Sequence, residues 1–157
     1  MAAYHFVTTW RLRAPLDAVW QAILEAQKWP SWWQGVLSVE QLRPAGEDGA
    51  GGVMHMVWRS RLPYNLAFDI ETTRVEPKRI IAGSATGELI GTGVWEMREH
   101  DGVTTARYTW DVRTSQAWMN LLAPIARPFF AWNHDYVMHS GAEGLARLLD
   151  AELIAQS

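Results

Sequence analysis

The chain has 157 residues, a length typical of one domain, and its 48% hydrophobic and 20% charged residues exclude a disordered chain. Its formal net charge of −3 provides no basic surface for phosphate backbones, so we expect no nucleic-acid partner. The chain has no cysteine, which excludes disulfides, thiolate catalysis, iron–sulfur clusters and zinc ribbons.

The N-terminal residues lack the basic and apolar regions of a signal peptide. The longest charge-poor stretch, Thr114 to His134, contains Pro124, Arg127 and Pro128 and is too interrupted for a membrane-spanning helix. We therefore expect a cytoplasmic protein without stable membrane insertion, forming a single domain over residues 1–157.

The N-terminal part of the chain predicts a strand followed by two short helices. Residues 4–13 alternate between bulky and polar side chains, which is the period of a half-buried strand. Pro15 suits the start of a helix, and apolar residues follow it at helical spacing. A second short helix is predicted at residues 29–33, led by Trp29-Pro30 and closed by Gly35.

Six further strands are predicted from the return of the two-residue period, near 36–43, 53–61, 65–76, 79–86, 90–99 and 103–113. Turn residues separate them, including Leu62-Pro63-Tyr64 and the hairpin signal Asp101-Gly102. Connections this short join antiparallel strands, so these segments predict a meander.

The last predicted element is a long amphipathic helix that starts at Pro128. One stripe contains Phe130, Asn133, His134, Val137, Gly141, Gly144, Leu145 and Leu148. Two glycines inside a helix are unfavourable by about 1 kcal/mol each, which a close approach of the sheet to the helix backbone would offset. Either the sheet closes on Gly141 and Gly144, or a tunnel remains between them.

These elements predict an α+β protein in which a seven-stranded antiparallel sheet curls around the long helix, with two short helices after the first strand. In this arrangement the sequence resembles the START-like (SRPBCC) superfamily with its helix-grip fold, and within it the polyketide cyclase/dehydrase-like group. The resemblance covers residues 3–150 and rests on Ala14-Pro15, Val19-Trp20, Trp29-Pro30, Trp32-Trp33, Gly91-Thr92-Gly93-Val94-Trp95, Asp101-Gly102-Val103-Thr104, Val137-Met138, Gly141, Gly144 and Leu145. Because the family includes lipid and hormone binders as well as cyclases, the resemblance implies an internal cavity without naming its ligand.

The bulkier face of each predicted strand indicates which side chains face the interior. Ten tryptophans in so short a chain are unusual, and large aromatic side chains with a few polar groups are typical of small-molecule cavities. The alternative is that these rings simply fill the core. The predicted ligand-binding residues are Trp10, Met56, Trp58, Phe68, Trp95, Tyr108, Trp110, Phe130, Asn133, His134 and Val137.

Few polar side chains are predicted to point inward: Thr8, Ser60, Thr72, Tyr108, Asn133 and His134. His134 alone among them titrates near neutral pH, so it is the candidate general acid or base, with Tyr108 or Asn133 stabilising an enolate-like oxygen. The alternative is a structural imidazole bonded to a backbone carbonyl or to Tyr108. We expect no metal site and no cofactor, and His55 is expected to stand alone on the outer face of its strand.

Three hypotheses follow for the function. The first is a protein that binds a small hydrophobic ligand, either aromatic polyketide-like or lipid-like, in an internal cavity. The second is a polyketide cyclase/dehydrase-type enzyme with His134 as the general acid or base. The third is a partner-interaction protein, in which the apolar segment 118–132 is an interface, for example in a homodimer. The alternatives for this segment are that it covers the cavity mouth, rests on a membrane or packs as an ordinary connection.

Overall fold

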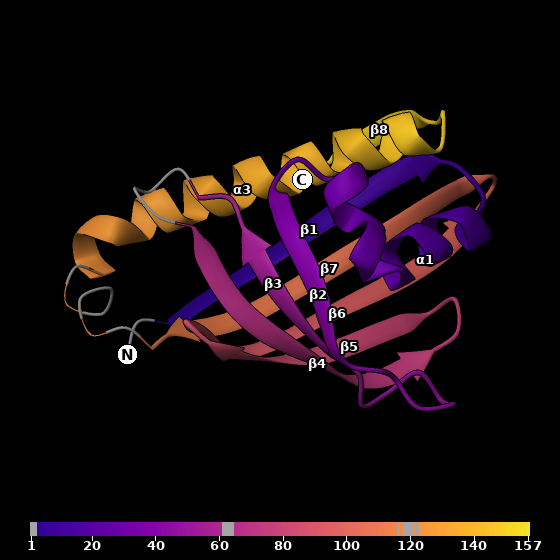
Figure 1. Ribbon diagram of the computed structural model, residues 1–157. Coiled ribbons are helices and arrows are strands. Elements are labelled where there is room, and N and C mark those ends of the chain that lie inside the picture. The colour runs from indigo at the N-terminus through magenta and orange to yellow at the C-terminus, as the bar shows by residue number, and fades with distance from the viewer. Residues whose placement is uncertain (1–2, 61–64, 116, 118–120, 122) are drawn as a thin grey trace.

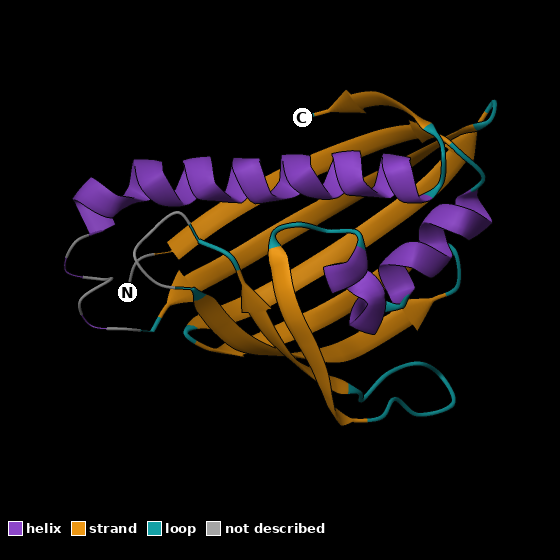
Figure 2. Ribbon diagram, turned by 45° about the horizontal axis from the view of Figure 1, so that its top comes forward, coloured by secondary structure: helices purple, strands orange, loops and turns teal. Residues whose placement is uncertain are grey.

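A long helix lies across the concave face of a strongly curved antiparallel sheet in the computed structural model of the protein (Figure 1, Figure 2). The structure describes residues 3–60, 65–115, 117, 121 and 123–157. The predicted α+β helix-grip fold is therefore confirmed. The predicted turn at residues 62–64 lies outside the described residues.

The chain begins with strand β1 (Ala3–Arg13), helix α1 (Leu16–Leu24) and the short 3-10 helix η1 (Ala26–Ser31). Pro15 precedes α1 in an extended conformation, and α1 buries Val19, Trp20 and Ile23 against the core. Pro30 lies within η1. The two short helices predicted after the first strand are thus present.

The predicted six-stranded meander is also confirmed, because each of these strands pairs antiparallel with the next. At the β6–β7 hairpin, Asp101 and Gly102 both have positive φ values of 50° and 77°, as a two-residue hairpin turn of this hand requires. The strands are β2 (Val36–Arg43), β3 (Val53–Trp58), β4 (Leu66–Glu76), β5 (Ile80–Gly87), β6 (Leu89–His100) and β7 (Val103–Thr114).

The sheet has eight strands rather than the predicted seven. The additional strand, β8 (Glu152–Gln156), follows the long helix and pairs antiparallel with β1. Since β1 also pairs with β7, the spatial order is β2-β3-β4-β5-β6-β7-β1-β8. The first strand is therefore an interior strand of the sheet, and β2 and β8 form its edges.

The long helix, α3 (Ala123–Leu148), begins before the predicted start at Pro128. Pro128 instead lies in the second turn, where its missing N–H removes only the bond to the carbonyl of Pro124. Leu145 and Ala142 are fully buried on this helix, whereas Ile125, Phe129 and Trp132 are exposed. No described helix combines the length and apolarity that crossing a membrane requires.

Candidate functional site: a cavity between the sheet and helix α3

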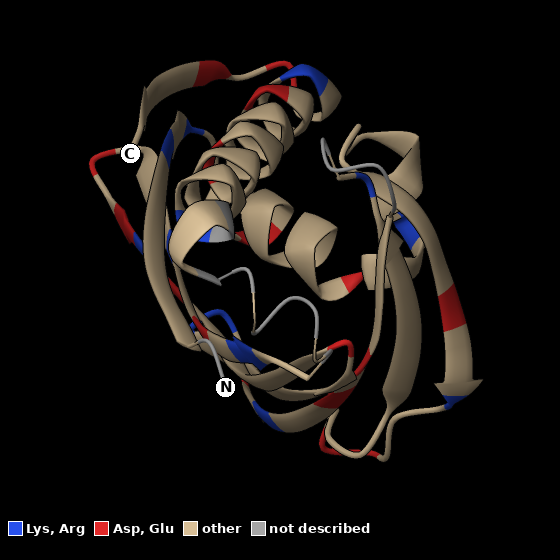
Figure 3. Ribbon diagram, turned by 90° about the vertical axis from the view of Figure 1, so that its left-hand side faces the viewer, with Lys and Arg blue, Asp and Glu red and all other residues tan. Residues whose placement is uncertain are grey.

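A cavity of about 380 Å³ lies between the concave face of the sheet and α3. This volume is within the range of roughly 300–1,000 Å³ found for small-molecule sites. Figure 3 views the molecule from the end at which β1 begins, with α3 and the curved sheet on either side of this interior. Strands β1 to β7 all contribute residues to the lining, as do α1, η1 and α3.

Most of the predicted ligand-binding residues lie on the cavity wall. Their side chains come from the inward face of four strands and from one face of α3, as strand and helix periodicity predicted. The residues that line the cavity are Met56, Trp58, Phe68, Trp95, Tyr108, Trp110, Phe130, Asn133, His134 and Val137.

Trp10 is the exception, because it lies in the core behind the cavity wall. Its side chain is fully buried, with its ring 5.2 Å from that of Trp33 and 5.1 Å from that of Trp95. The strand parity was correct, since Trp10 does point toward the concave face. Trp33, however, comes from the segment after η1 and packs over the Trp10 ring. Strand periodicity contains no information about where that segment lies.

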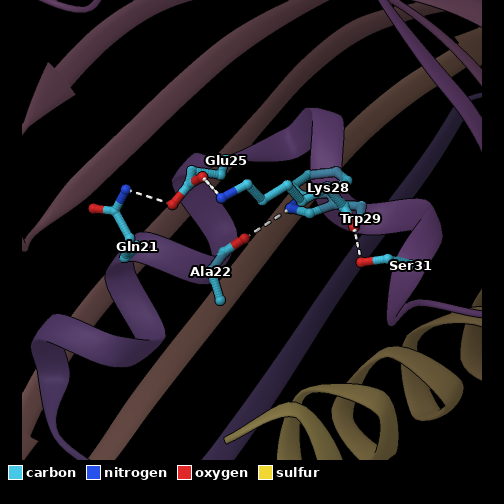
Figure 4. Close-up of polar contacts among 6 residues, drawn as sticks. All are labelled: Gln21, Ala22, Glu25, Lys28, Trp29 and Ser31. Atoms are coloured by element: carbon cyan, nitrogen blue, oxygen red, sulfur yellow. Dashed lines mark hydrogen bonds and ion pairs between the residues drawn. The ribbon is translucent and has the colours of Figure 1, made fainter.

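Two tryptophans from the short-helix region, Trp29 and Trp33, line the cavity and were not among the predicted site residues. The Trp29 indole N–H donates to the Ala22 carbonyl at 3.2 Å, and Lys28 forms an ion pair with Glu25 nearby (Figure 4). The Trp33 indole N–H donates to the Val137 carbonyl of α3 at 2.9 Å. The cluster of three tryptophans between residues 29 and 33 is the sequence feature that could have predicted this part of the cavity wall.

The glycines of α3 receive this tryptophan segment rather than the sheet. A Cβ at Gly141 would lie 2.5 Å from the indole of Trp33, and a Cβ at Gly144 would overlap the Trp32 carbonyl oxygen. The expected contact between the helix backbone and the sheet at these glycines is therefore wrong. The cavity lies closer to the N-terminus of α3, where Phe130, Asn133, His134 and Val137 line it.

His134 lines the cavity with its ring stacked on Phe6, at a centroid distance of 4.2 Å and an interplanar angle of 15°. Neither ring nitrogen has a hydrogen-bond partner among the described residues, and Nδ1 is 3.8 Å from the nearest Asp135 carboxylate oxygen. Burial lowers the pKa of His134 to about 4, with Asp135 opposing that shift. The imidazole is therefore neutral at pH 7. The alternative prediction, a hydrogen bond from the ring to a backbone carbonyl or to Tyr108, is not found among the described residues.

Tyr108 and Asn133 also reach the cavity wall. The Tyr108 ring packs against Trp95 at 4.6 Å and against Trp110 at 5.8 Å. Its hydroxyl occupies the place where a Cβ on Gly93 would lie, so this glycine allows the ring to lie across β6. Burial raises the pKa of Tyr108, which keeps the phenol protonated. Among the other predicted inward polar residues, Thr72 lines the cavity, whereas Thr8 and Ser60 do not.

Charged side chains are scarce at the cavity. Of the described lining residues only Arg59 carries a full charge, and it is exposed to solvent. His55 does not stand alone as expected, because its Nδ1 lies 2.7 Å from Asp69 on the neighbouring strand. Within the described ranges, no three His, Asp or Glu side chains come together to form a metal site.

The family model for polyketide cyclase/dehydrase and lipid transport proteins matches residues 4–150. Among curated proteins, no sequence matches the chain. Solved structures share the fold at low sequence identity. The Zhui aromatase/cyclase from Streptomyces sp. R1128 is similar with a TM-score of 0.78 and 17% identity, over 95% of this chain and 94% of that chain.

Two further structures extend the likeness of fold. A START superfamily protein from Mycobacterium smegmatis has a TM-score of 0.72 and 10% identity, over 93% of this chain and 97% of that one. The protein TTHA0849 from Thermus thermophilus has a TM-score of 0.75 and 13% identity, over 92% and 99% of the two chains. At these identities the likeness establishes the architecture that encloses the cavity.

Proposed function

Because the chain belongs to the polyketide cyclase/dehydrase and lipid transport family, we propose that it binds a small hydrophobic molecule, aromatic polyketide-like or lipid-like, in the cavity beneath α3. The observation that carries this proposal is the wall of aromatic and apolar side chains around about 380 Å³ of space. Indole and phenol rings hold flat apolar molecules well and keep a polar group available. The scarcity of buried charge favours an uncharged guest over an ionic one.

Tryptophan fluorescence and native mass spectrometry test this function directly, since five of the ten tryptophans line the cavity: Trp29, Trp33, Trp58, Trp95 and Trp110. A panel of 2-naphthol, emodin, farnesol and palmitate covers aromatic, isoprenoid and fatty-acyl classes. We expect saturable quenching and a one-to-one complex with at least one class. Absence of both for every class would contradict the proposal.

A matched pair of variants places binding in the cavity. Met56 lines the cavity, whereas its neighbour Val57 does not. Met56→Trp fills part of the space and is expected to weaken binding by at least about tenfold, because overpacked interiors do not expand freely. Val57→Trp adds the same ring outside the cavity and is expected to leave the affinity unchanged.

The second candidate is a cyclase/dehydrase-type enzyme, favoured by the position of His134 at the cavity with two unpartnered ring nitrogens. A neutral imidazole accepts a proton, and Tyr108 or Asn133 would donate to the developing enolate oxygen. The cavity would hold a flexible chain in reactive register. A pKa of about 4 makes His134 a weak base, which favours the binding role at neutral pH.

His134→Ala distinguishes the two candidates when cyclisation and binding of a linear poly-β-ketone are both measured. For the enzyme, turnover is lost while binding remains nearly intact. For the binding protein, no turnover is seen in either form. The homodimer and the cytoplasmic location remain predictions, and light scattering at high protein concentration tests the first.

A further inference from the structure

Two polar side chains at one end of the cavity lack hydrogen-bond partners. The hydroxyl of Tyr4 and both ring nitrogens of His134 are buried, and no group in the described part of the chain donates to them or accepts from them. Buried polar groups are nearly always paired in proteins, because an unmade hydrogen bond leaves the loss of water uncompensated. Both residues line the cavity, and each of these atoms has less than 1 Å² of accessible surface, so a ligand pairs with them only when the side chains turn toward it.

The two side chains come from different elements and meet around one pair of phenylalanines. Phe6 of β1 stacks on Tyr4 at 5.9 Å and on His134 at 4.2 Å. Phe130 of α3 lies 5.2 Å from Tyr4 and one helical turn before His134. The unpaired atoms therefore border the same flat, apolar surface, and one small molecule can contact the rings and the polar atoms together.

The hydrogen-bonding capacity of this pair suits an uncharged oxygen. A phenol donates one hydrogen bond and accepts others, and a neutral imidazole has one donor and one acceptor nitrogen. Arg127 makes no hydrogen bond to the Tyr4 hydroxyl, although its positive charge opposes the rise in the pKa of this group that burial causes. Its guanidinium lies over the Tyr4 ring, 4.8 Å from the centroid, and donates to the backbone carbonyl of Ala3.

Among the described lining residues, no buried cation is available to pair with a carboxylate. Arg59, the one described lining residue with a full charge, lies at the end of β3 and is exposed. A buried anion without a partner is strongly unfavourable, whereas a hydroxyl or carbonyl group needs only hydrogen bonds.

We infer that the ligand is a flat, largely apolar molecule with an uncharged hydroxyl or carbonyl oxygen, bound by Tyr4 and His134 while its rings lie against Phe6 and Phe130. This inference rests on the proposed binding function and narrows the ligand class. It disfavours pure hydrocarbons, which leave both polar side chains unpaired, and molecules that must bury a carboxylate.

Three probes of nearly equal shape test the inference by calorimetric titration: 2-naphthol, 2-methylnaphthalene and 2-naphthoate. We expect 2-naphthol to bind about tenfold more tightly than 2-methylnaphthalene, the worth of one or two neutral hydrogen bonds. The 2-naphthoate anion is expected to bind more weakly than 2-naphthol, by roughly tenfold or more.

Two variants test whether Tyr4 and His134 cause the preference for 2-naphthol. Tyr4→Phe and His134→Phe keep the ring size, and each is expected to reduce the preference for 2-naphthol over 2-methylnaphthalene to about threefold or less. The affinity for 2-methylnaphthalene is expected to stay within about twofold, because the apolar contacts remain. Tyr136→Phe removes a phenol that does not line the cavity and is the matched control.

The outcomes separate the inference from the proposed function. Equal binding of 2-naphthol and 2-methylnaphthalene overturns the inference and leaves the binding function standing. Tighter binding of 2-naphthoate also overturns it, as does a preference for 2-naphthol that persists in both Phe variants. If none of the three probes binds, the inference fails, and the proposed function fails with it only when farnesol and palmitate do not bind either.

Discussion

The imidazole of His134 is in an environment that suits only its neutral form. One ring face rests on Phe6, and the side chain is 13% exposed, with no carboxylate of a described residue within hydrogen-bond distance of either nitrogen. Desolvation of the charged form is the main cause of the lowered pKa. The same residue is therefore expected to affect stability as well as the proposed ligand recognition.

This environment predicts a loss of stability in acid. The folded-state pKa of about 4 lies below the ordinary value of 6.5, so as the pH falls the unfolded chain binds the proton first. The contribution of neutral His134 to the free energy of unfolding is complete above pH 6.5 and is lost progressively as the pH falls to about 4. The expected loss from this one residue is about 3 kcal/mol.

Urea denaturation at pH 7, 6, 5 and 4.5 measures this effect in the wild type and in His134→Phe. We expect the variant to lose less stability on acidification, because the two proteins differ at no other titratable group. Parallel stability curves for the two proteins would show that His134 does not titrate in this range.

At the scale of elements, the close contact between α3 and the segment after η1 requires glycine at positions 141 and 144. Alanine at either glycine would favour the isolated helix by about 1 kcal/mol, but its methyl group meets Trp33 at position 141 and the Trp32 carbonyl at position 144. We expect Gly141→Ala to lower the free energy of unfolding by about 2 kcal/mol, a typical cost of overpacking. Gly144→Ala is expected to cost more, because a backbone carbonyl cannot rotate away as a side chain can.

Chemical denaturation of both variants measures these losses, with Arg147→Ala as the control on the exposed face of the same helix. The control is expected to change stability by no more than about 0.5 kcal/mol. Stabilisation by either glycine replacement would mean that the helix and the tryptophan segment are not in contact there.

The elements that the sequence could predict are those defined by local pattern. Alternating side chains and turn residues located β2 to β7 closely, because hairpin neighbours are adjacent in sequence. The five-residue β8 was missed because its partner is β1, at the other end of the chain, and pairing rather than propensity forms it. The start of α3 was misplaced because a proline in the second turn is tolerated.

The same distinction applies to the site. Strand parity correctly placed Met56, Phe68, Trp95, Tyr108 and Trp110 on the cavity wall, since each strand presents alternate residues to one face. Parity could not show that Trp33 covers Trp10, which depends on where an irregular segment folds. The pairing of Gly141 with Trp33 is likewise a tertiary contact, which a single sequence does not specify.

For the molecule as a whole, the two sides of the cavity differ in how they are supported. On one side β1 is an interior strand between β7 and β8, and β6 and β7 pair over twelve registered positions. On the other side β2 is an edge strand with mostly exposed residues, paired only to β3 and with two irregularities in that register. Segments with few buried contacts open first, so the β2–β3 side is the weaker wall.

We therefore predict that ligand binding protects the two walls unequally. In hydrogen-exchange mass spectrometry of the free protein, amides in Val36–Arg43 and Val53–Trp58 are expected to exchange faster than those in Leu89–His100 and Val103–Thr114. A guest larger than 2-naphthol, such as emodin, is expected to reach Met56 and Trp58 on β3 as well and to hold that wall in place, so its protection is expected to fall mainly on β2 and β3. The Met56→Trp variant, which occupies part of the same space, is expected to show part of this protection without any ligand. Protection spread evenly over all strands would mean instead that the sheet opens as one unit and that ligands enter only through global fluctuation.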